Sequence, residues 1–382
     1  MMRRAAPLCP LLLLLLLASP VRAQHDHDAM AAPAGGAPIL MKGFGDVHHP
    51  VTTRSREAQR FIDQGLALCY GFNHDEAVRS FEEAARLDPD CAMAHWGIAY
   101  ACGPNINLPM DAEHGKRAYD EIQKALAGKA GPAERDYIEA MAKRYANPPA
   151  GDQHVMDQAY ADAMREVVKK HPNDLDAAVL FAESLMDLRP WNFWTIDGKA
   201  QPGTDEMVAT LERVLKKDPK HIGAIHFYIH AVEASSDPHR ADKYASKLPS
   251  LAPAAGHLVH MPTHIYIRTG RYDDVVGLNT KALEADRAYL GPDRLAHGTD
   301  IYRLMYYTHN LHMRWAGYMM SGRSADAVAA AHDVVAAVPV DVIRAMPPAE
   351  FLCPPVYFTE VRFGKWDDIL KEPAPPADLR YT

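Results

Sequence analysis

Histidines are the residues of this sequence that are best placed to do chemistry. Ten of the 20 histidines fall within residues 221–312. Two pairs of them are separated by 34 residues, His226 with His260 and His230 with His264. Neutral imidazole suits copper, zinc and iron, and no CxxC pair offers a competing thiolate site. The cluster therefore predicts a transition-metal site for copper, zinc or iron.

The elements that must position these histidines are helices. Sequence punctuation divides the region into six predicted helices, at residues 220–234, 238–248, 255–269, 272–290, 300–318 and 323–337. The first, third and fifth carry most of the histidines, and in stacked hairpins such alternate helices line one concave face. Residues four apart share a helix face, and neighbouring helix axes lie about 8–10 Å apart. Imidazoles of adjacent helices can therefore share an ion.

The expected ligands follow from these helix faces. They are His226, His230, Glu233, His257, His260, His264, His309 and His312. Glu233 is expected to complete a mixed nitrogen and oxygen shell. A purely structural alternative remains open, in which each histidine is a buried polar residue bonded to a tyrosine or a carbonyl. Pro262 adds a geometric question, because a helix that begins there would leave His260 just outside it.

A repeat pattern begins near residue 58. Six residues fall at the spacings of the 34-residue tetratricopeptide unit, namely Phe61, Gly65, Ala77, Phe81, Ala84 and Pro89. Glycine-led segments recur at Gly270, Gly322 and Gly364, and each is typical of a turn inside a helical hairpin. The sequence therefore predicts an all-α fold, an α-solenoid of irregular tetratricopeptide-like hairpins over residues 55–370.

Residues 55–370 resemble a family of exported bacterial tetratricopeptide-repeat proteins. The most distinctive stretches are Tyr70-Gly71-Phe72-Asn73-His74 and His260-Met261-Pro262-Thr263-His264. The resemblance implies a scaffold that binds a protein or peptide partner in its concave groove, since this fold by itself implies no reaction. A further segment, Trp191-Asn192-Phe193-Trp194, is interpreted either as a peptide-binding loop or as packing across an irregular hairpin.

The N-terminus predicts export to the periplasm or the medium. Arg3 and Arg4 precede the apolar run Leu11–Leu17, and Val21-Arg22-Ala23 is typical of a cleavage site, so residues 1–23 are interpreted as a signal peptide. The apolar run is too short to span a membrane. Residues 24–54 are rich in Ala, Gly and Pro and are expected to be a flexible linker, and residues 371–382 a Pro-rich tail.

Charge and cysteine content narrow the classes of function. Lys and Arg number 41 against 49 Asp and Glu, which gives a net charge of −8, and no long basic run occurs. Nucleic acid is therefore not an expected partner. The four cysteines after the signal peptide are expected to be buried thiols or to form one disulfide.

Two classes of function are compatible with these patterns. The first is an exported scaffold that binds a protein or peptide and carries the histidine metal site. The alternative is a metal-dependent enzyme, a hydrolase or an oxidoreductase, that uses the same histidines. In the enzyme, Glu233 would act as the base and Tyr302 or Tyr306 as the proton donor.

Overall fold

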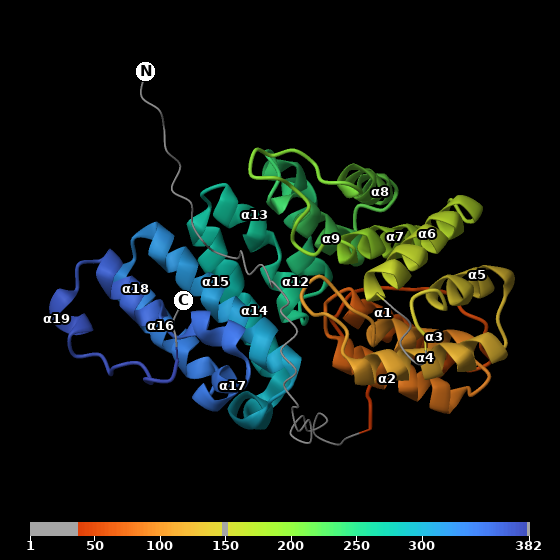
Figure 1. The fold of residues 1–382 in the computed structure, drawn as a ribbon, viewed down its shortest axis with the longest axis horizontal. Helices are drawn as coiled ribbons and strands as arrows, with labels where there is room; N and C mark the ends of the chain where they lie inside the picture. Colours follow the sequence, from red (N-terminus) through yellow and green to blue (C-terminus); the bar gives the residue numbers. More distant parts are fainter. Residues whose placement is uncertain (1–36, 147–151, 380–382) are drawn as a thin grey trace.

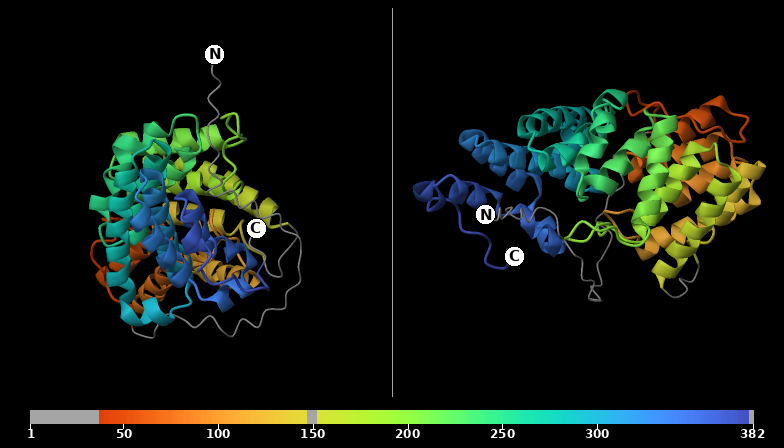
Figure 2. Two further views of the ribbon diagram at one scale, coloured as in Figure 1. Left: turned by 90° about the vertical axis from the view of Figure 1, so that its left-hand side faces the viewer. Right: turned by 90° about the horizontal axis from the view of Figure 1, so that it is seen from above.

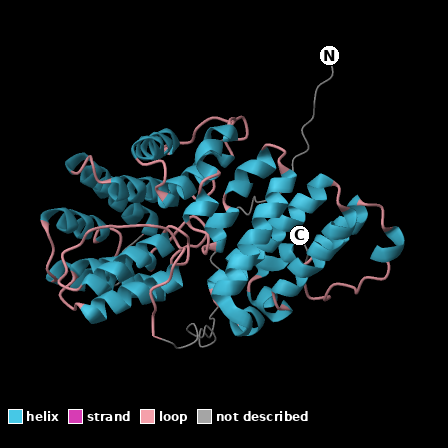
Figure 3. Ribbon diagram, turned by 180° about the vertical axis from the view of Figure 1, so that it is seen from behind, coloured by secondary structure: helices cyan, strands magenta, loops and turns pink. Residues whose placement is uncertain are grey.

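The computed structural model describes residues 37–146 and 152–379. Within these ranges the protein is built from helices and contains no β-strand, only three isolated bridges (Figure 3). The all-α fold predicted from the sequence is therefore confirmed. The predicted signal peptide, residues 1–23, lies outside the described residues. No helix in the described ranges has the length and apolar character needed to cross a lipid bilayer.

The first part of the chain forms helices that pack mainly on their sequence neighbours (Figure 1). These helices are α1 (Arg56–Cys69), α2 (His74–Leu87), α3 (Ala92–Ala101), α4 (Ala112–Ala127), α5 (Pro132–Met141), α6 (Gln153–Lys170), α7 (Leu175–Asp187) and α8 (Thr204–Lys217). Gly65 is essential to this packing, because a Cβ atom there would lie 2.6 Å from the ring of Phe81. The small residue in the predicted repeat unit is thus explained by the close approach of α1 and α2.

The second part continues in the same manner, with shorter and more irregular pieces (Figure 2). Its α-helices are α9 (Ile222–Glu233), α10 (Asp242–Ala245), α11 (Leu248–Leu251), α12 (Gly256–His260), α13 (Pro262–Arg268), α14 (Tyr272–His297), α15 (Thr308–Ser321), α16 (Ser324–Ala337), α17 (Val340–Ala345), α18 (Pro355–Arg362) and α19 (Trp366–Ile369). A π-helical turn, Tyr302–Tyr307, leads into α15, and 3-10 turns occupy Pro238–Ala241 and Pro347–Leu352.

The three glycine-led turns are confirmed by their backbone angles. Gly270, Gly322 and Gly364 have φ values of 81°, 75° and 66°, and each follows the end of a helix. This left-handed conformation is the usual C-terminal stop of a helix and favours glycine, which has no Cβ to clash. The residues predicted as hairpin turns therefore end α13, α15 and α18.

Two predicted helices of the histidine region are interrupted. The predicted helix 238–248 is a 3-10 turn followed by the short α10 and the start of α11. The predicted helix 255–269 is divided at Met261, because Pro262 lacks the N–H that would continue the hydrogen-bond ladder. Met261 nevertheless keeps helical angles, φ −50° and ψ −39°. His260 at the end of α12 and His264 in α13 therefore remain on adjacent turns.

The segment 37–54 differs from the flexible linker that composition predicted for residues 24–54. It forms no helix or strand, yet Phe44 and His49 are buried in it. The main-chain carbonyl of Gly43 accepts the N–H of Ala254 at 2.8 Å, and Met41 donates its N–H to Gln64. Composition cannot reveal such tertiary partners, and the described part of the segment is packed against the helices.

The remaining expectations concern cysteines and the tail. Cys69, Cys91 and Cys102 are buried free thiols, so no disulfide joins any two of these three, and Cys353 is partly buried. Residues 371–379 of the Pro-rich tail contain no helix and are tethered by the ion pair of Asp378 with Arg344.

Candidate metal centre

Helices α9, α12, α13 and α15 bring the histidines together in the middle of the molecule (Figure 1). Seven of the eight predicted ligands meet there, namely Glu233 and the histidines His226, His230, His257, His260, His264 and His309. The six histidines form two groups of three, and within each group the candidate ligand atoms lie within 4.8 Å of one another. Glu233 forms a further group of the same spacing with His230 and His264. We call the first group, His226, His230 and His257, the His226 set. We call the second, His260, His264 and His309, the His264 set.

The His226 set is oriented by a distant main-chain carbonyl. The Nδ1 atom of His226 lies 2.7 Å from the carbonyl oxygen of Tyr70. A carbonyl only accepts, so Nδ1 carries the proton and the Nε2 lone pair of the neutral ring is directed at His257. The Nε2 atoms of His226 and His257 are 3.2 Å apart. The third member, His230, has a buried Nε2 without a hydrogen-bond partner.

The His264 set brings two lone pairs face to face. His260 donates Nδ1–H to the Oδ1 atom of Asn279 at 2.9 Å, because the amide nitrogen of Asn279 donates to the carbonyl of Val275. His264 donates Nδ1–H to a carboxylate oxygen of Glu233, also at 2.9 Å. Both Nε2 atoms are then unprotonated in the neutral rings, yet they lie 2.9 Å apart. A cation between them would remove this conflict.

His309 completes the His264 set from α15. Its Nε2 atom lies 3.4 Å from the Nε2 atom of His264. The nitrogens of a tetrahedral ion with bonds of 2.0–2.1 Å are separated by about 3.3 Å. The separations of 2.9 and 3.4 Å within this set bracket that distance. The set therefore has the spacing of three ligands on one ion.

Glu233 holds one histidine of each set. Its Oε1 atom accepts Nδ1–H of His230 at 2.8 Å, and its Oε2 atom accepts Nδ1–H of His264 at 2.9 Å. In this structure both oxygens orient imidazoles, while its expected role as a ligand stays a prediction, because Glu233 also has the spacing of a ligand with His230 and His264. A carboxylate behind a ligand histidine is the common outer-shell arrangement of metal sites, and it fixes the ring and its tautomer.

Burial keeps these imidazoles in the form that binds metal. It lowers the pKa of His226, His257, His260 and His309 well below the usual 6.5, and lowers the pKa of His230 as well. Burial alone would raise the pKa of Glu233, but the imidazoles of His264 and His230 outweigh it and lower that pKa. At neutral pH the site therefore combines these five neutral imidazoles with the ionised carboxylate of Glu233. Ligation requires neutral imidazole.

His312 is a predicted ligand that the structure places elsewhere. Its ring packs on Trp315, with centroids 5.0 Å apart, and on Phe351 at 5.7 Å. Burial lowers its pKa to about 4. His312 follows His309 by three residues, but its side chain enters the packing between α15 and the segment before α18. The sequence spacing does not distinguish these two environments.

Two aromatic residues pack on the histidines and were missed as part of the site. Phe72 and Trp191 are the two non-glycine residues with positive φ in the described ranges, at 56° and 61°. The Phe72 ring lies 4.5 Å from that of His226, and the Trp191 ring lies 5.1 Å from that of His230. Each such backbone conformation costs about 1–2 kcal/mol. Phe72 lies in the segment 70–74 that carries the family resemblance, and Trp191 lies in the segment 191–194 that was interpreted as a peptide-binding loop or as packing.

The expected proton donors are engaged elsewhere. Tyr302 donates its hydroxyl to Asp286 at 2.8 Å. The ring of Tyr306 lies against that of His257 with centroids 4.8 Å apart, while its hydroxyl accepts a hydrogen bond from Asn107. Tyr306 therefore contributes a wall of the site, and neither hydroxyl has a hydrogen bond to a histidine side chain of the two sets.

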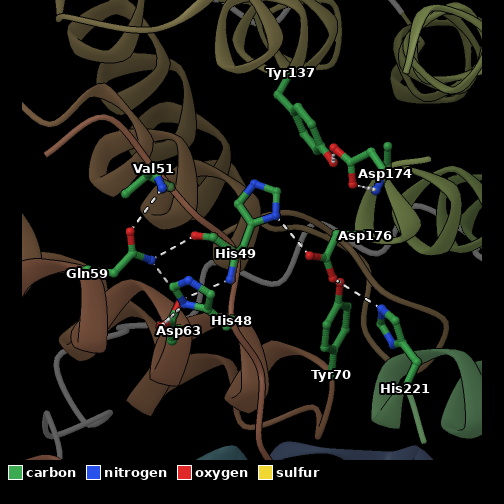
Figure 4. A network of polar contacts seen from close by, with 11 residues as sticks. His48, His49, Val51, Gln59, Asp63, Tyr70, Tyr137, Asp174, Asp176 and His221 are labelled. Carbon is green, nitrogen blue, oxygen red and sulfur yellow. Dashed lines mark hydrogen bonds and ion pairs between the residues drawn. The ribbon is translucent and has the colours of Figure 1, made fainter. Parts of the chain in front are cut away.

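Figure 4 shows a second polar network, around Asp176. Tyr70 connects it to the centre, because its hydroxyl bonds to Asp176 and its carbonyl oxygen to His226. The Asp176 carboxylate accepts from the Tyr70 hydroxyl at 2.6 Å, from His49 at 2.8 Å and from His221 at 3.2 Å. Burial opposes ionisation of Asp176, but the bonds from His221 and His49 outweigh it and lower the pKa of Asp176.

His49, Asp174 and Asp176 also have the spacing of metal ligands. Both oxygens of Asp176 already accept hydrogen bonds, however, and Asp174 caps α7 and accepts from Tyr137. This arrangement is complete without an ion. We therefore treat it as the structural network that ties residues 37–54 to α7 and α9.

The described geometry thus gives a cluster of six buried or half-buried imidazoles with an orienting carboxylate. Comparison of the sequence with models of protein families finds no match, and comparison with curated proteins finds none either.

Proposed function

We propose that this protein is an exported helical-repeat scaffold of the tetratricopeptide type whose histidine centre binds a transition metal. The single observation that carries the metal site is the contact between His260 and His264. Their Nε2 atoms lie 2.9 Å apart although both rings have committed their proton at Nδ1. Two buried acceptors in contact are costly without a cation, and an ion bound to both makes the arrangement favourable.

The donor set narrows the choice of ion. Imidazole nitrogens suit copper, zinc, iron and nickel, whereas calcium and magnesium prefer oxygen ligands. Four of the histidines, His226, His230, His260 and His264, expose only Nε2 to the centre because their Nδ1 atoms are bonded to the protein. We therefore expect a copper or zinc ion held by Nε2 atoms, with iron as a weaker fit.

The scaffold part of the proposal is supported by the order of the helices. Successive helices pack on one another, as α1 on α2, α2 on α3, α7 on α8 and α15 on α16. Glycine-led turns separate several of them. Stacked hairpins of this kind offer a concave surface for a protein or peptide partner. Export follows from the predicted signal peptide, residues 1–23.

A metal-dependent enzyme is the second candidate, and one observation favours it. Each set offers three imidazoles, and catalytic zinc sites typically have three protein ligands and an open fourth position. Glu233 cannot serve as a free base in this arrangement, because both its oxygens accept Nδ1–H groups. A hydrolase or oxidoreductase at this centre would need its base or its proton donor from the substrate or from water.

Competition with a coloured chelator tests the metal site. The metal-free full chain should remove copper or zinc from the chelator, and His264→Ala should weaken this affinity at least 100-fold because His264 belongs to the closest ligand pair. His332→Ala is the matched control, since His332 lies half exposed on α16, far from these contacts. Equal affinity of wild-type and His264→Ala protein would contradict the proposal.

A further inference from the structure

The six histidines have the arrangement of two adjacent sites. The Nε2 atoms of His226 and His257 are 3.2 Å apart, close to the separation of about 3.3 Å between two nitrogens on one tetrahedral ion. The His264 set has the same property, with separations of 2.9 and 3.4 Å. Four nitrogens fill a tetrahedral ion, so six imidazoles exceed what one such ion can bind.

Each set also contains its own unsatisfied nitrogen. In the His226 set, the Nε2 atom of His230 is buried without a partner, while its Nδ1 proton is committed to Glu233. In the His264 set, the conflict is the contact of two unprotonated Nε2 atoms. A buried polar atom without a partner costs about 1–3 kcal/mol. The first of these places lies in the His226 set and the second in the His264 set, so each set gives its own indication of an ion.

We propose that the centre holds two transition-metal ions, one in each set, and that Glu233 joins the two sites. Glu233 binds His230 of the His226 set through one oxygen and His264 of the His264 set through the other. The rings of His230 and His264 lie side by side, with centroids 5.0 Å apart. The inference rests on the proposed function, because both require that these imidazoles bind metal.

Charge favours copper as the occupant of this pair. All six ligands are neutral, and Glu233 is the one carboxylate that hydrogen-bonds a ligand histidine among the described residues. His226 and His260 are fully buried, and His230, His257 and His264 are nearly so. Uncompensated charge in such surroundings is costly. Two cuprous ions bring two positive charges, whereas two zinc ions bring four.

The aromatic residues complete the enclosure of the His226 set. Phe72 stacks on His257 at 5.5 Å between ring centroids, and Tyr306 contacts the same ring at 4.8 Å. Such apolar surroundings exclude water and lower the local dielectric, which again favours the ion of lower charge. The strained backbone of Phe72 is thereby connected to the site that its ring covers.

Anaerobic titration of the metal-free full chain with cuprous ions tests the proposal, and zinc is titrated in parallel. Copper is measured per chain after gel filtration. Wild-type protein should retain two copper ions. His257→Ala and His309→Ala should each retain one, because each removes one ligand from a different set. His332→Ala, outside both sets, should retain two. Zinc should bind more weakly than copper at the second site.

Different outcomes of this titration would contradict the two-ion pair alone or the proposed metal site as a whole. One copper ion per wild-type chain, lost in both His257→Ala and His309→Ala, would overturn the pair but leave a single metal site. No bound copper or zinc would overturn both. Oxidation of the loaded wild-type protein to the cupric state gives a readout that needs no variant. Paramagnetic resonance should show dipolar broadening and a half-field signal, because the two cupric ions lie close together, whereas the spectrum of two isolated cupric ions would place them too far apart for these sets.

Discussion

The carbonyl oxygen of Tyr70 accepts the Nδ1 proton of His226 at 2.7 Å, across 156 residues of sequence. The same residue donates its hydroxyl to Asp176 at 2.6 Å. Through these two bonds the loop between α1 and α2 connects the Asp176 network to the histidine centre. The tautomer of His226, and therefore the direction of its free nitrogen, depends on this loop.

Glu233→Gln should weaken metal binding 10- to 100-fold, the usual effect of losing an outer-shell partner. A glutamine side chain has one carbonyl oxygen, so it can accept from only one of the two Nδ1–H groups that Glu233 accepts. Its NH2 group would face the other imidazole and favour the wrong tautomer. Isothermal titration with copper and zinc measures the change. Unaltered affinity would show that Glu233 does not orient the ligands.

Asp176→Asn should destabilise the metal-free protein by about 3 kcal/mol, because it breaks a buried ionic network. His49, Tyr70 and His221 all donate to this carboxylate, and an amide cannot accept from all three. Tyr70→Phe removes only one of these bonds and should cost about 1 kcal/mol. Urea unfolding measures both variants. Equal costs would contradict the view that Asp176 is the centre of the network.

The fluorescence of Trp191 should report whether a cupric ion is bound at His230. Its ring lies 5.1 Å from that of His230, so a cupric ion bound there should quench its fluorescence strongly. Trp191→Phe should lose most of the copper-dependent quenching while it retains bound copper. Trp366→Phe is the matched control, because Trp366 lies exposed on α19. If Trp366→Phe removes the quenching instead, copper binds somewhere other than the described cluster.

His312→Gln should alter the pH dependence of stability without altering metal affinity. Burial lowers the folded-state pKa of His312 to about 4, below the unfolded value of about 6.5. The unfolded chain therefore takes up a proton first on acidification. The stability due to the neutral ring is fully present above pH 6.5 and is lost as the pH falls from 6.5 to 4.

Over that range the wild-type protein should lose about 3 kcal/mol relative to His312→Gln, at about 1.4 kcal/mol per pH unit. Urea unfolding of both metal-free proteins at several pH values gives the difference. A difference that does not change with pH would contradict the assigned environment of His312. A loss of bound copper in His312→Gln would show that His312 is a metal ligand.

Sequence patterns predicted the all-α fold and most of the histidine cluster, because both depend on local patterns. Helical periodicity and the spacing of 34 residues are local properties. The spacing correctly places His230 near His264, whereas His226 meets His257 and lies in a different set from His260. The orienting partners are not local. Tyr70 reaches the histidines from the loop after α1, and Asn279 from α14, which carries no histidine of the two sets, so the histidine spacing could not indicate them.

The features that the sequence did not predict correctly also depend on contacts between residues that are distant in the sequence. His309 and His312 both occupy inner positions of α15, and only the packing of Trp315 and Phe351 separates their environments. The segment 37–54 has the composition of a linker, but the partners that bury His49 come from α7. Glu233 was recognised as a member of the site, whereas its role depends on which imidazole atoms its oxygens meet.

An anomalous difference map of metal-loaded crystals would show directly whether a metal ion lies between His260 and His264. The full chain would be loaded with copper and crystallised, and data collected on both sides of the copper absorption edge. We expect a peak about 2.0–2.1 Å from the Nε2 atoms of both His260 and His264, and a second peak within the His226 set. Fully loaded crystals with no anomalous peak between His260 and His264 would contradict the proposed metal site.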